Sequence, residues 1–130
     1  MKMNQTRLLS VAVSCAAVCA IVVPISVSAQ DAPLSYNASP EVYKLLAENS
    51  QFRVILATWK PGQHDVQHSH SANVVYRLTD CNARVSGADG KVLSQGDGKA
   101  GSVVLQDAIG SHSFENTGTS DCQILLVERK

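Results

Sequence analysis

The sequence predicts an all-β protein, a small barrel or sandwich of short strands with one short helix before it. From about residue 52 onward, β-branched, aromatic and aliphatic residues occur in short runs at the period of a strand. Turn-forming residues separate these runs at spacings typical of antiparallel sheets. The chain has 130 residues, 45 % hydrophobic content and no formal net charge, which fits a single globular domain.

Residues 1–29 are expected to be a secretory signal peptide. Two basic residues precede an apolar run over residues 8–27, and Val27-Ser28-Ala29 supplies the small residues that a signal peptidase accepts. The run is almost long enough for a permanent membrane anchor, which is the competing interpretation. Pro24 and the absence of a following basic residue favour cleavage after Ala29. We therefore expect a periplasmic or secreted protein with no stable membrane anchor.

Residues 30–50 are expected to form a polar leader and the short helix. Val42, Leu45 and Leu46 lie at helical spacing, and Ser39-Pro40 is a typical helix start, so the helix is expected over residues 40–49. The barrel domain is then expected over residues 51–130.

The barrel strands are expected in the apolar runs between turn signals. The first ends at the turn pair Pro61-Gly62. Residues 79–82 and 117–120 are expected to be hairpin turns, and a third turn is expected over 88–90. The expected strands cover residues 52–59, 74–78, 83–85, 91–93, 102–105, 111–115 and 123–127.

Three of the four histidines, His64, His68 and His70, lie within seven positions. Residues i and i+2 of a strand point to the same face, so His68 and His70 present two imidazoles side by side. His112 lies on a later strand, and it completes a set of three if that strand is a neighbour. Neutral imidazole suits Zn, Cu, Fe and Ni. Three protein ligands with open coordination positions are typical of a catalytic or ligand-binding metal.

The spacing around the first histidine pair resembles the first motif of the cupin superfamily, a glycine, five residues and H-x-H. Gly62, five residues and His68-Ser69-His70 match it. In that motif a glutamate and a further glycine follow the histidine pair.

The second cupin motif is a glycine, five residues, P-x-G, two residues, a histidine, three residues and an asparagine. Gly101, Asp107, His112 and Asn116 keep this spacing, although Asp107 and Ile109 replace the proline and the glycine. The resemblance covers residues 52–127. It implies a jelly-roll, or double-stranded β-barrel, with a metal or ligand site in its mouth, and a homodimer as the oligomeric state.

The glutamate of the first motif is absent. Asn73 or Val74 takes its place, depending on the end from which the motif is counted, and no carboxylate lies between Asp65 and Asp80. An all-imidazole set has lower affinity for hard ions such as Mn. We expect Asn73 at most to bind weakly or to lie behind the ligands, and the same holds for His64.

His64-Asp65-Val66-Gln67-His68 also resembles the HExxH motif of zinc proteases, with aspartate in place of glutamate. That motif requires a helix to bring its two histidines together. A five-residue segment between a Pro-Gly turn and a strand is a poor helix, so this alternative is disfavoured.

Cys81 and Cys122 are the two cysteines that remain after signal removal. Export would place them where disulfides persist, and their bridge would close a loop of about forty residues, worth on the order of 4 kcal/mol. Two buried thiols are the alternative. The position of each cysteine beside an expected turn favours the bridge.

Charge excludes one class of partner. Removing Lys2 and Arg7 with the signal leaves nine basic against eleven acidic side chains, without a basic stripe, so nucleic acid is not an expected partner.

Two functions remain. The first is an exported cupin that holds one divalent transition metal (Fe, Zn, Cu, Ni or Mn) through His68, His70 and His112 and binds or acts on a small molecule. If it is an enzyme, dioxygenase- or isomerase-type chemistry is expected, but no catalytic acid or base is apparent. The alternative is a metal-free, non-catalytic module that binds a small ligand.

Overall fold

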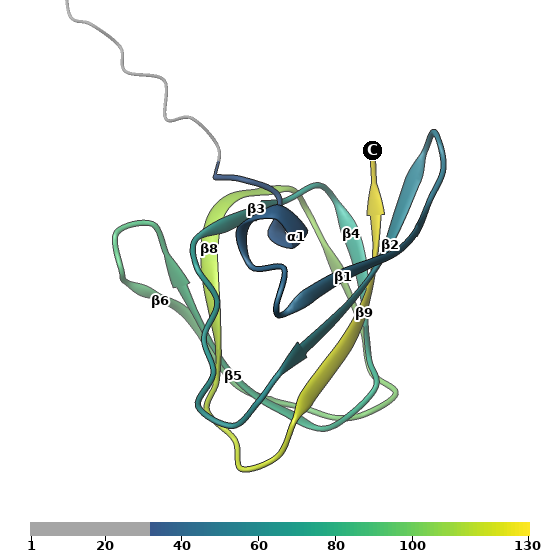
Figure 1. Ribbon diagram of the computed structural model, residues 1–130. Coiled ribbons are helices and arrows are strands. Elements are labelled where there is room, and N and C mark those ends of the chain that lie inside the picture. Colours follow the sequence, from purple (N-terminus) through teal and green to yellow (C-terminus); the bar gives the residue numbers. More distant parts are fainter. Residues whose placement is uncertain (1–31) are drawn as a thin grey trace, which may run out of the picture.

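Two antiparallel sheets face each other in the computed structural model, which describes residues 32–130 (Figure 1). The strand order is β1-β2-β9-β4-β7 in the first sheet and β3-β8-β5-β6 in the second. The predicted signal peptide lies outside the described residues. The elements are α1 (Ser35–Ala38), β1 (Tyr43–Glu48), β2 (Phe52–Trp59), β3 (His68–His70), β4 (Asn73–Arg77), β5 (Cys81–Gly87), β6 (Val92–Gly98), β7 (Val103–Gln106), β8 (Ile109–Asn116) and β9 (Cys122–Arg129).

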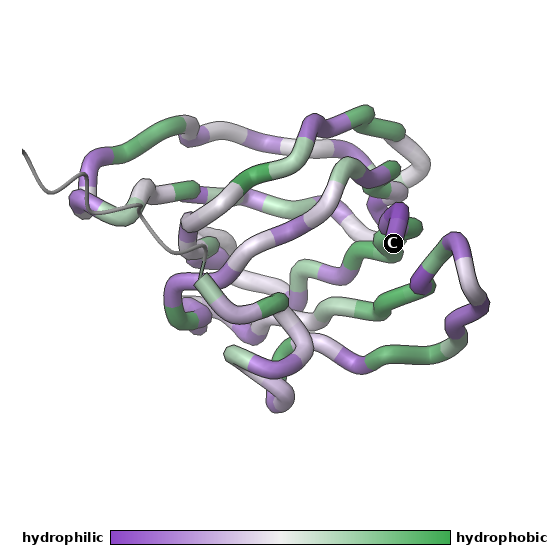
Figure 2. Tube along the Cα trace, turned by 90° about the horizontal axis from the view of Figure 1, so that it is seen from above, coloured by the Kyte–Doolittle hydropathy of each residue, from purple (hydrophilic) through white to green (hydrophobic). Residues whose placement is uncertain are grey.

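Alternation along the strands places one set of side chains between the sheets, as the all-β prediction requires. On β9, Cys122, Ile124, Leu126 and Glu128 are buried, whereas the residues between them are only half-buried. Figure 2 shows polar and apolar residues alternating along much of the trace. The apolar core comprises Val42, Tyr43, Ile55, Ala57, Trp59, Val75, Cys81, Cys122, Ile124 and Leu126.

The predicted helix over residues 40–49 is wrong. Most of that segment is the edge strand β1, which pairs with β2 and contains a bulge between Leu45 and Ala47. Pairing with β2 buries Tyr43, and this tertiary gain outweighs the local helical spacing of the apolar residues. The one helix of the described residues, α1, comes earlier and is a single turn.

Two of the three predicted hairpins are also wrong. β4 and β5 belong to different sheets, and so do β8 and β9, so residues 79–82 and 117–120 cross from one sheet to the other. A turn signal between two apolar runs does not determine which strand each run pairs with. The turn over residues 88–90 is confirmed, because β5 pairs with β6.

A disulfide joins the two sheets where these crossings end. Cys81 is the first residue of β5 and Cys122 the first residue of β9, and their Sγ atoms are 2.06 Å apart. Both cysteines are buried in the core. Within residues 32–130, no helix has the length and apolar character needed to cross a bilayer.

Candidate metal and ligand site

Pairing between β3 and β8 brings His68, His70 and His112 together. His68 lies directly opposite His112, and after a register shift His70 lies opposite Ile109. The ring centroids are 4.4 to 5.1 Å apart, and one nitrogen of each ring lies within 4.8 Å of those of the other two. All three side chains are buried. His112 therefore lies on a strand next to that of the histidine pair, which was the condition for a set of three.

The backbone around β3 explains why both histidines of the pair point inward. Ser69, between them, points to the other face of β3, where it is also buried and its hydroxyl donates to the carbonyl oxygen of Ala32 at 2.6 Å. The glycines that open the two motifs, Gly62 and Gly101, have φ of 74° and 79°, a left-handed conformation that strongly favours glycine. The turns before β3 and β7 therefore explain why glycine occurs at these two positions of the motifs.

Hydrogen bonds fix which nitrogen of His68 carries its proton. Nδ1 lies 2.8 Å from the carbonyl oxygen of Val66, and a carbonyl can only accept. Nδ1 is therefore the donor, and Nε2 has a free lone pair. That Nε2 lies 3.0 Å from Nε2 of His70.

His70 has the same arrangement through a different partner. Its Nδ1 donates to Oε1 of Glu128, a completely buried carboxylate on β9. An ionised carboxylate can only accept, so in the neutral form of His70, the form that binds metal, Nδ1 carries the proton and Nε2 has a free lone pair. With both rings neutral, two nitrogen lone pairs face each other at hydrogen-bond distance.

Tyr43 adds a third acceptor at the same point. Its hydroxyl donates to Oδ2 of Asp65 at 2.8 Å, while its oxygen lies 3.1 Å from Nε2 of His68. Burial, together with the charge of Asp65, raises the pKa of Tyr43 well above its ordinary value, so the hydroxyl stays protonated. Facing acceptors without a donor repel one another, and a cation between them removes this repulsion.

The nitrogen pair of His68 and His70 fits a transition-metal ion. Two nitrogens bound at right angles to one ion, each at about 2.1 Å, are about 3.0 Å apart, which is the separation of the two Nε2 atoms. Burial lowers the pKa of His68 below its ordinary value, and burial followed by the two neighbouring rings lowers the pKa of His112 to about 3. His68 and His112 are therefore neutral near pH 7, the form that binds metal. Nδ1 of His112 is buried with no hydrogen-bond partner among residues 32–130.

Asp65 supports the cluster from behind. It accepts hydrogen bonds from Tyr43 Oη, from Trp59 Nε1 at 3.0 Å and from the backbone N–H of Phe114 at 2.7 Å. These donors come from β1, β2 and β8, so one buried carboxylate ties three strands together at the histidines. This position is not that of a protease base, because residues 61–67 are not helical and His64 is exposed.

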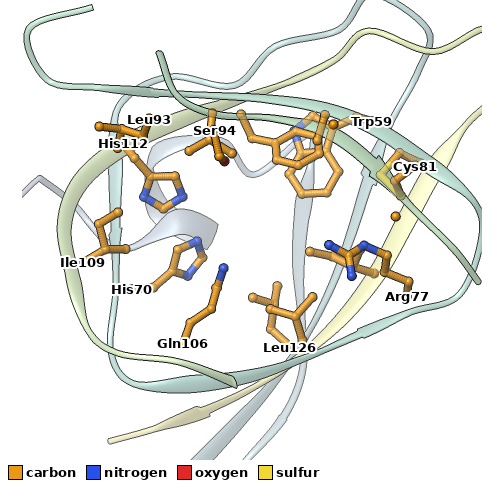
Figure 3. A pocket seen from close by; sticks show the side chains of 18 of the residues that line it. Trp59, His70, Arg77, Cys81, Leu93, Ser94, Gln106, Ile109, His112 and Leu126 are labelled. Carbon is orange, nitrogen blue, oxygen red and sulfur yellow. A yellow bond between two sulfur atoms is a disulfide. The ribbon is translucent and has the colours of Figure 1, made fainter. Parts of the chain in front are cut away.

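A cavity of about 610 Å³ adjoins the histidines. Figure 3 shows His70 and His112 at one end of it and Arg77 and Cys81 at the other. Trp59 lies in its wall and stacks on Phe114, with ring centroids 4.2 Å apart. The remaining wall is largely apolar, with Val75, Val85, Ile124 and Leu126 among its residues.

Comparison with solved structures identifies the fold. A cupin domain from Bordetella pertussis Tohama I matches with a TM-score of 0.61 and 18 % sequence identity, over 68 % of this chain and 92 % of that protein. The chain has the cupin fold. A conserved protein with a double-stranded β-helix domain from Klebsiella pneumoniae matches with a TM-score of 0.54 and 19 % sequence identity, over 68 % of this chain and 75 % of that protein. A cupin superfamily protein from Desulfitobacterium hafniense matches with a TM-score of 0.51 and 13 % sequence identity, over 68 % of this chain and 75 % of that protein. No family matches by sequence, and no curated protein does.

Two residues that were expected at most as weak or supporting ligands lie outside the cluster. Asn73 is buried at the place of the missing glutamate, but its amide donates to the carbonyl oxygen of Ser71, and no hydrogen bond within residues 32–130 joins it to a histidine. His64 is exposed to solvent and pairs only through its backbone, with Glu115.

Sequence reasoning missed Glu128 and Tyr43 as members of this site. Glu128 is 58 residues from His70, and only the β4–β9 register brings it into contact. Its place in the inward phase of β9, among buried aliphatic residues, was the signal available: a charged residue at a core position requires a partner. Tyr43 was hidden by the incorrect helix.

Proposed function

We propose that this protein binds one divalent transition metal through His68, His70 and His112 and binds or converts a small molecule in the adjoining cavity. The observation that carries the proposal is the 3.0 Å separation of two Nε2 atoms whose rings both donate through Nδ1. Between two neutral rings this arrangement of buried lone pairs is unfavourable without a cation. The fold and the histidine cluster agree with it.

The bound metal would supply a Lewis acid with open coordination positions, as dioxygenase- or isomerase-type chemistry requires. The chain supplies the surroundings. Glu128 and the carbonyl of Val66 hold the two imidazoles with Nε2 directed at one point. The stacked rings of Trp59 and Phe114 give the cavity an apolar wall that limits access of water to the site.

The test is metal content. The protein without its signal peptide is purified without a histidine tag, incubated with Fe, Zn, Cu, Ni and Mn in turn, and analysed for bound metal beside the His68→Ala/His70→Ala variant. We expect about one ion per wild-type chain and none in a variant that keeps the wild-type circular dichroism spectrum. No metal in wild type after all five incubations would refute the proposal.

The cavity favours a second candidate, a metal-free module that binds a small ligand. Its volume and apolar wall do not depend on a metal, and the first-motif glutamate is absent. Stoichiometric ligand binding by protein treated with EDTA, with no turnover after metal addition, would identify this second function.

The proposal includes export to the periplasm or outside the cell. The disulfide between Cys81 and Cys122 supports it, because such bridges persist in oxidising compartments. N-terminal sequencing of the processed protein is expected to begin at Gln30. A mature chain that starts at Met1 would contradict cleavage after Ala29.

The proposal also includes a homodimer. Val74 and Tyr76 on β4 and Val103 and Leu105 on β7 form an exposed apolar patch on the outer face of the first sheet, and Leu105 is 78 % exposed. Sedimentation of wild type is expected to give a dimer and of Leu105→Glu a monomer. Val92→Glu, an equally polar change at an exposed position of β6, is the control.

A further inference from the structure

One strongly basic side chain lies in the cavity wall, at the end opposite the histidines. Arg77 is the only lysine or arginine among the lining residues that the structure describes. It follows Asn73 and Val75 on the inward face of β4, where alternate residues are buried. Figure 3 shows Arg77 directed into the cavity, across from His70 and His112.

The guanidinium of Arg77 has a prepared position. Nη1 donates to Oγ of Ser102 at 3.0 Å, and the backbone N–H of Arg77 donates to the carbonyl oxygen of the same residue. The group lies against Gly98 of β6, where an added Cβ would be 2.1 Å from Nε of Arg77. Glycine at this point leaves the space that the guanidinium fills.

The charge of Arg77 is not neutralised by the part of the chain that the structure describes. No carboxylate oxygen of residues 32–130 lies within salt-bridge distance of it, although six other lysine and arginine side chains there have such partners. Asp97, in the cavity wall, is the register partner of the exposed Asn82, whereas Gly98 is the partner of the buried Cys81. Gly98 lies on the face of β6 that contacts Arg77, so the side chain of Asp97 points to the other face of that strand.

The surroundings of Arg77 select among anions. A planar guanidinium matches a carboxylate through two parallel hydrogen bonds. A phosphate dianion requires further donors, such as a second basic residue or a glycine-rich loop, and the described cavity wall has no second lysine or arginine. The cavity wall includes the apolar side chains of Trp59, Phe114, Val75, Ile124 and Leu126, beside polar residues such as Gln106 and Asp107.

We propose that the small molecule is a monocarboxylate with an apolar body. Its carboxylate pairs with Arg77, its body lies along Trp59 and Phe114, and its far end faces His70 and His112. This inference rests on the proposed function, because it places the ligand in the same cavity. It adds the chemical class of the ligand and the residue that recognises its charge.

The single tryptophan of the chain, Trp59, supplies the measurement. Its fluorescence is followed while phenylacetate or hexanoate is added to the EDTA-treated protein, and phenylacetamide and hexanamide are added in parallel as neutral analogues of the same shape. We expect each acid to bind about tenfold or more tightly than its amide, the effect of one charge-assisted hydrogen-bonded pair. The preference should weaken as salt is added.

Variants locate the preference. Arg77→Gln is expected to reduce acid affinity about tenfold, to the level of the amide, whereas Arg129→Gln, at an exposed position of β9, leaves both affinities unchanged. Gly98→Ala keeps the charge but displaces the guanidinium, so the acid is expected to lose its advantage there too. If Arg77→Gln does not fold, the wild-type comparison of acid with amide and the Gly98→Ala variant decide.

Each outcome has one meaning. Equal binding of acid and amide by wild type, or no binding of either acid, overturns the inference, and so does an acid preference that survives in folded Arg77→Gln. Because the titration uses metal-free protein, an acid preference lost in Arg77→Gln supports the inference even where metal analysis refutes the metal site. Metal binding without an acid preference overturns the ligand class alone.

Discussion

Glu128 on β9 lies directly opposite Asn73 on β4, and it is Glu128 that supplies a carboxylate to His70. Asn73 stands at one of the two positions that the count of the first cupin motif allows for its glutamate. Both residues are buried on the inward face of the same sheet. The carboxylate that the motif lacks is therefore present on the neighbouring strand, where it contacts the outer nitrogen of His70, and its second oxygen is buried without a partner among residues 32–130.

The first prediction concerns Glu128→Gln. A neutral amide in place of the carboxylate weakens the hydrogen bond that orients His70, so metal affinity is expected to fall by about 10- to 100-fold. Competition with a chromogenic chelator measures this. Glu41→Gln, at an exposed position, is the matched control.

Adding Asn73→Glu to Glu128→Gln returns a carboxylate to the directly opposed position, and part of the affinity is expected to return with it. A folded Glu128→Gln protein with unchanged affinity would show that the contact with His70 has no part in metal binding.

The second prediction concerns Tyr43→Phe. Removing the hydroxyl deprives Oδ2 of Asp65 of one of its two side-chain donors, in a completely enclosed position. We expect the free energy of unfolding of the metal-free protein to fall by about 1–3 kcal/mol. Urea denaturation is the measurement, and Tyr76→Phe, at an exposed position, should change stability by less than about 0.5 kcal/mol. Equal effects of the two substitutions would mean that the hydrogen bond to Asp65 contributes nothing.

Short-range patterns predicted the parts of the site that lie on one strand. His68 and His70 are two residues apart, so any extended backbone puts them on one face. Gly62 and Gly101 mark turns that require a left-handed residue, and such positions are visible in a sequence. The location of β2 and the all-β class follow from the same kind of local signal.

The other parts of the site depend on how distant strands pair with one another. Glu128 meets His70 only because β9 pairs with β4 in one register, and Asp65 meets Tyr43 and Trp59 only because β1 joins the edge of β2. Local spacing carries no information on either pairing. For the same reason the turns after β4 and β8 were assigned to hairpins although both cross between sheets.

The third prediction is a pH dependence of the metal-free protein. Burial, and then His68 and His70, lowers the pKa of His112 to about 3 from its ordinary value of 6.5. Between these two pH values the unfolded chain binds a proton that the folded chain does not, so stability falls as pH falls. The slope from this residue alone is about 1.4 kcal/mol per pH unit. Above pH 6.5 the contribution of His112 to the free energy of unfolding is fully present.

Urea denaturation in EDTA at several pH values between 4 and 7 measures that slope. His112→Gln is expected to remove about one proton from the difference between the folded and unfolded chains, and with it about 1.4 kcal/mol per pH unit. His64→Gln, at an exposed position, should leave the slope unchanged. A His112→Gln protein with the wild-type slope would place the proton uptake elsewhere.

The fourth prediction concerns the disulfide. Cys81 and Cys122 are 41 positions apart in sequence and join the two sheets, so the bridge restricts the unfolded chain over a long loop. The Cys81→Ala/Cys122→Ala variant is expected to lose about 4 kcal/mol of stability in guanidinium denaturation. Its metal affinity should stay within about twofold of wild type, because Figure 3 shows Cys81 at the end of the cavity opposite His112. A large loss of metal affinity in a folded variant would mean that the bridge positions the histidines through the cavity wall.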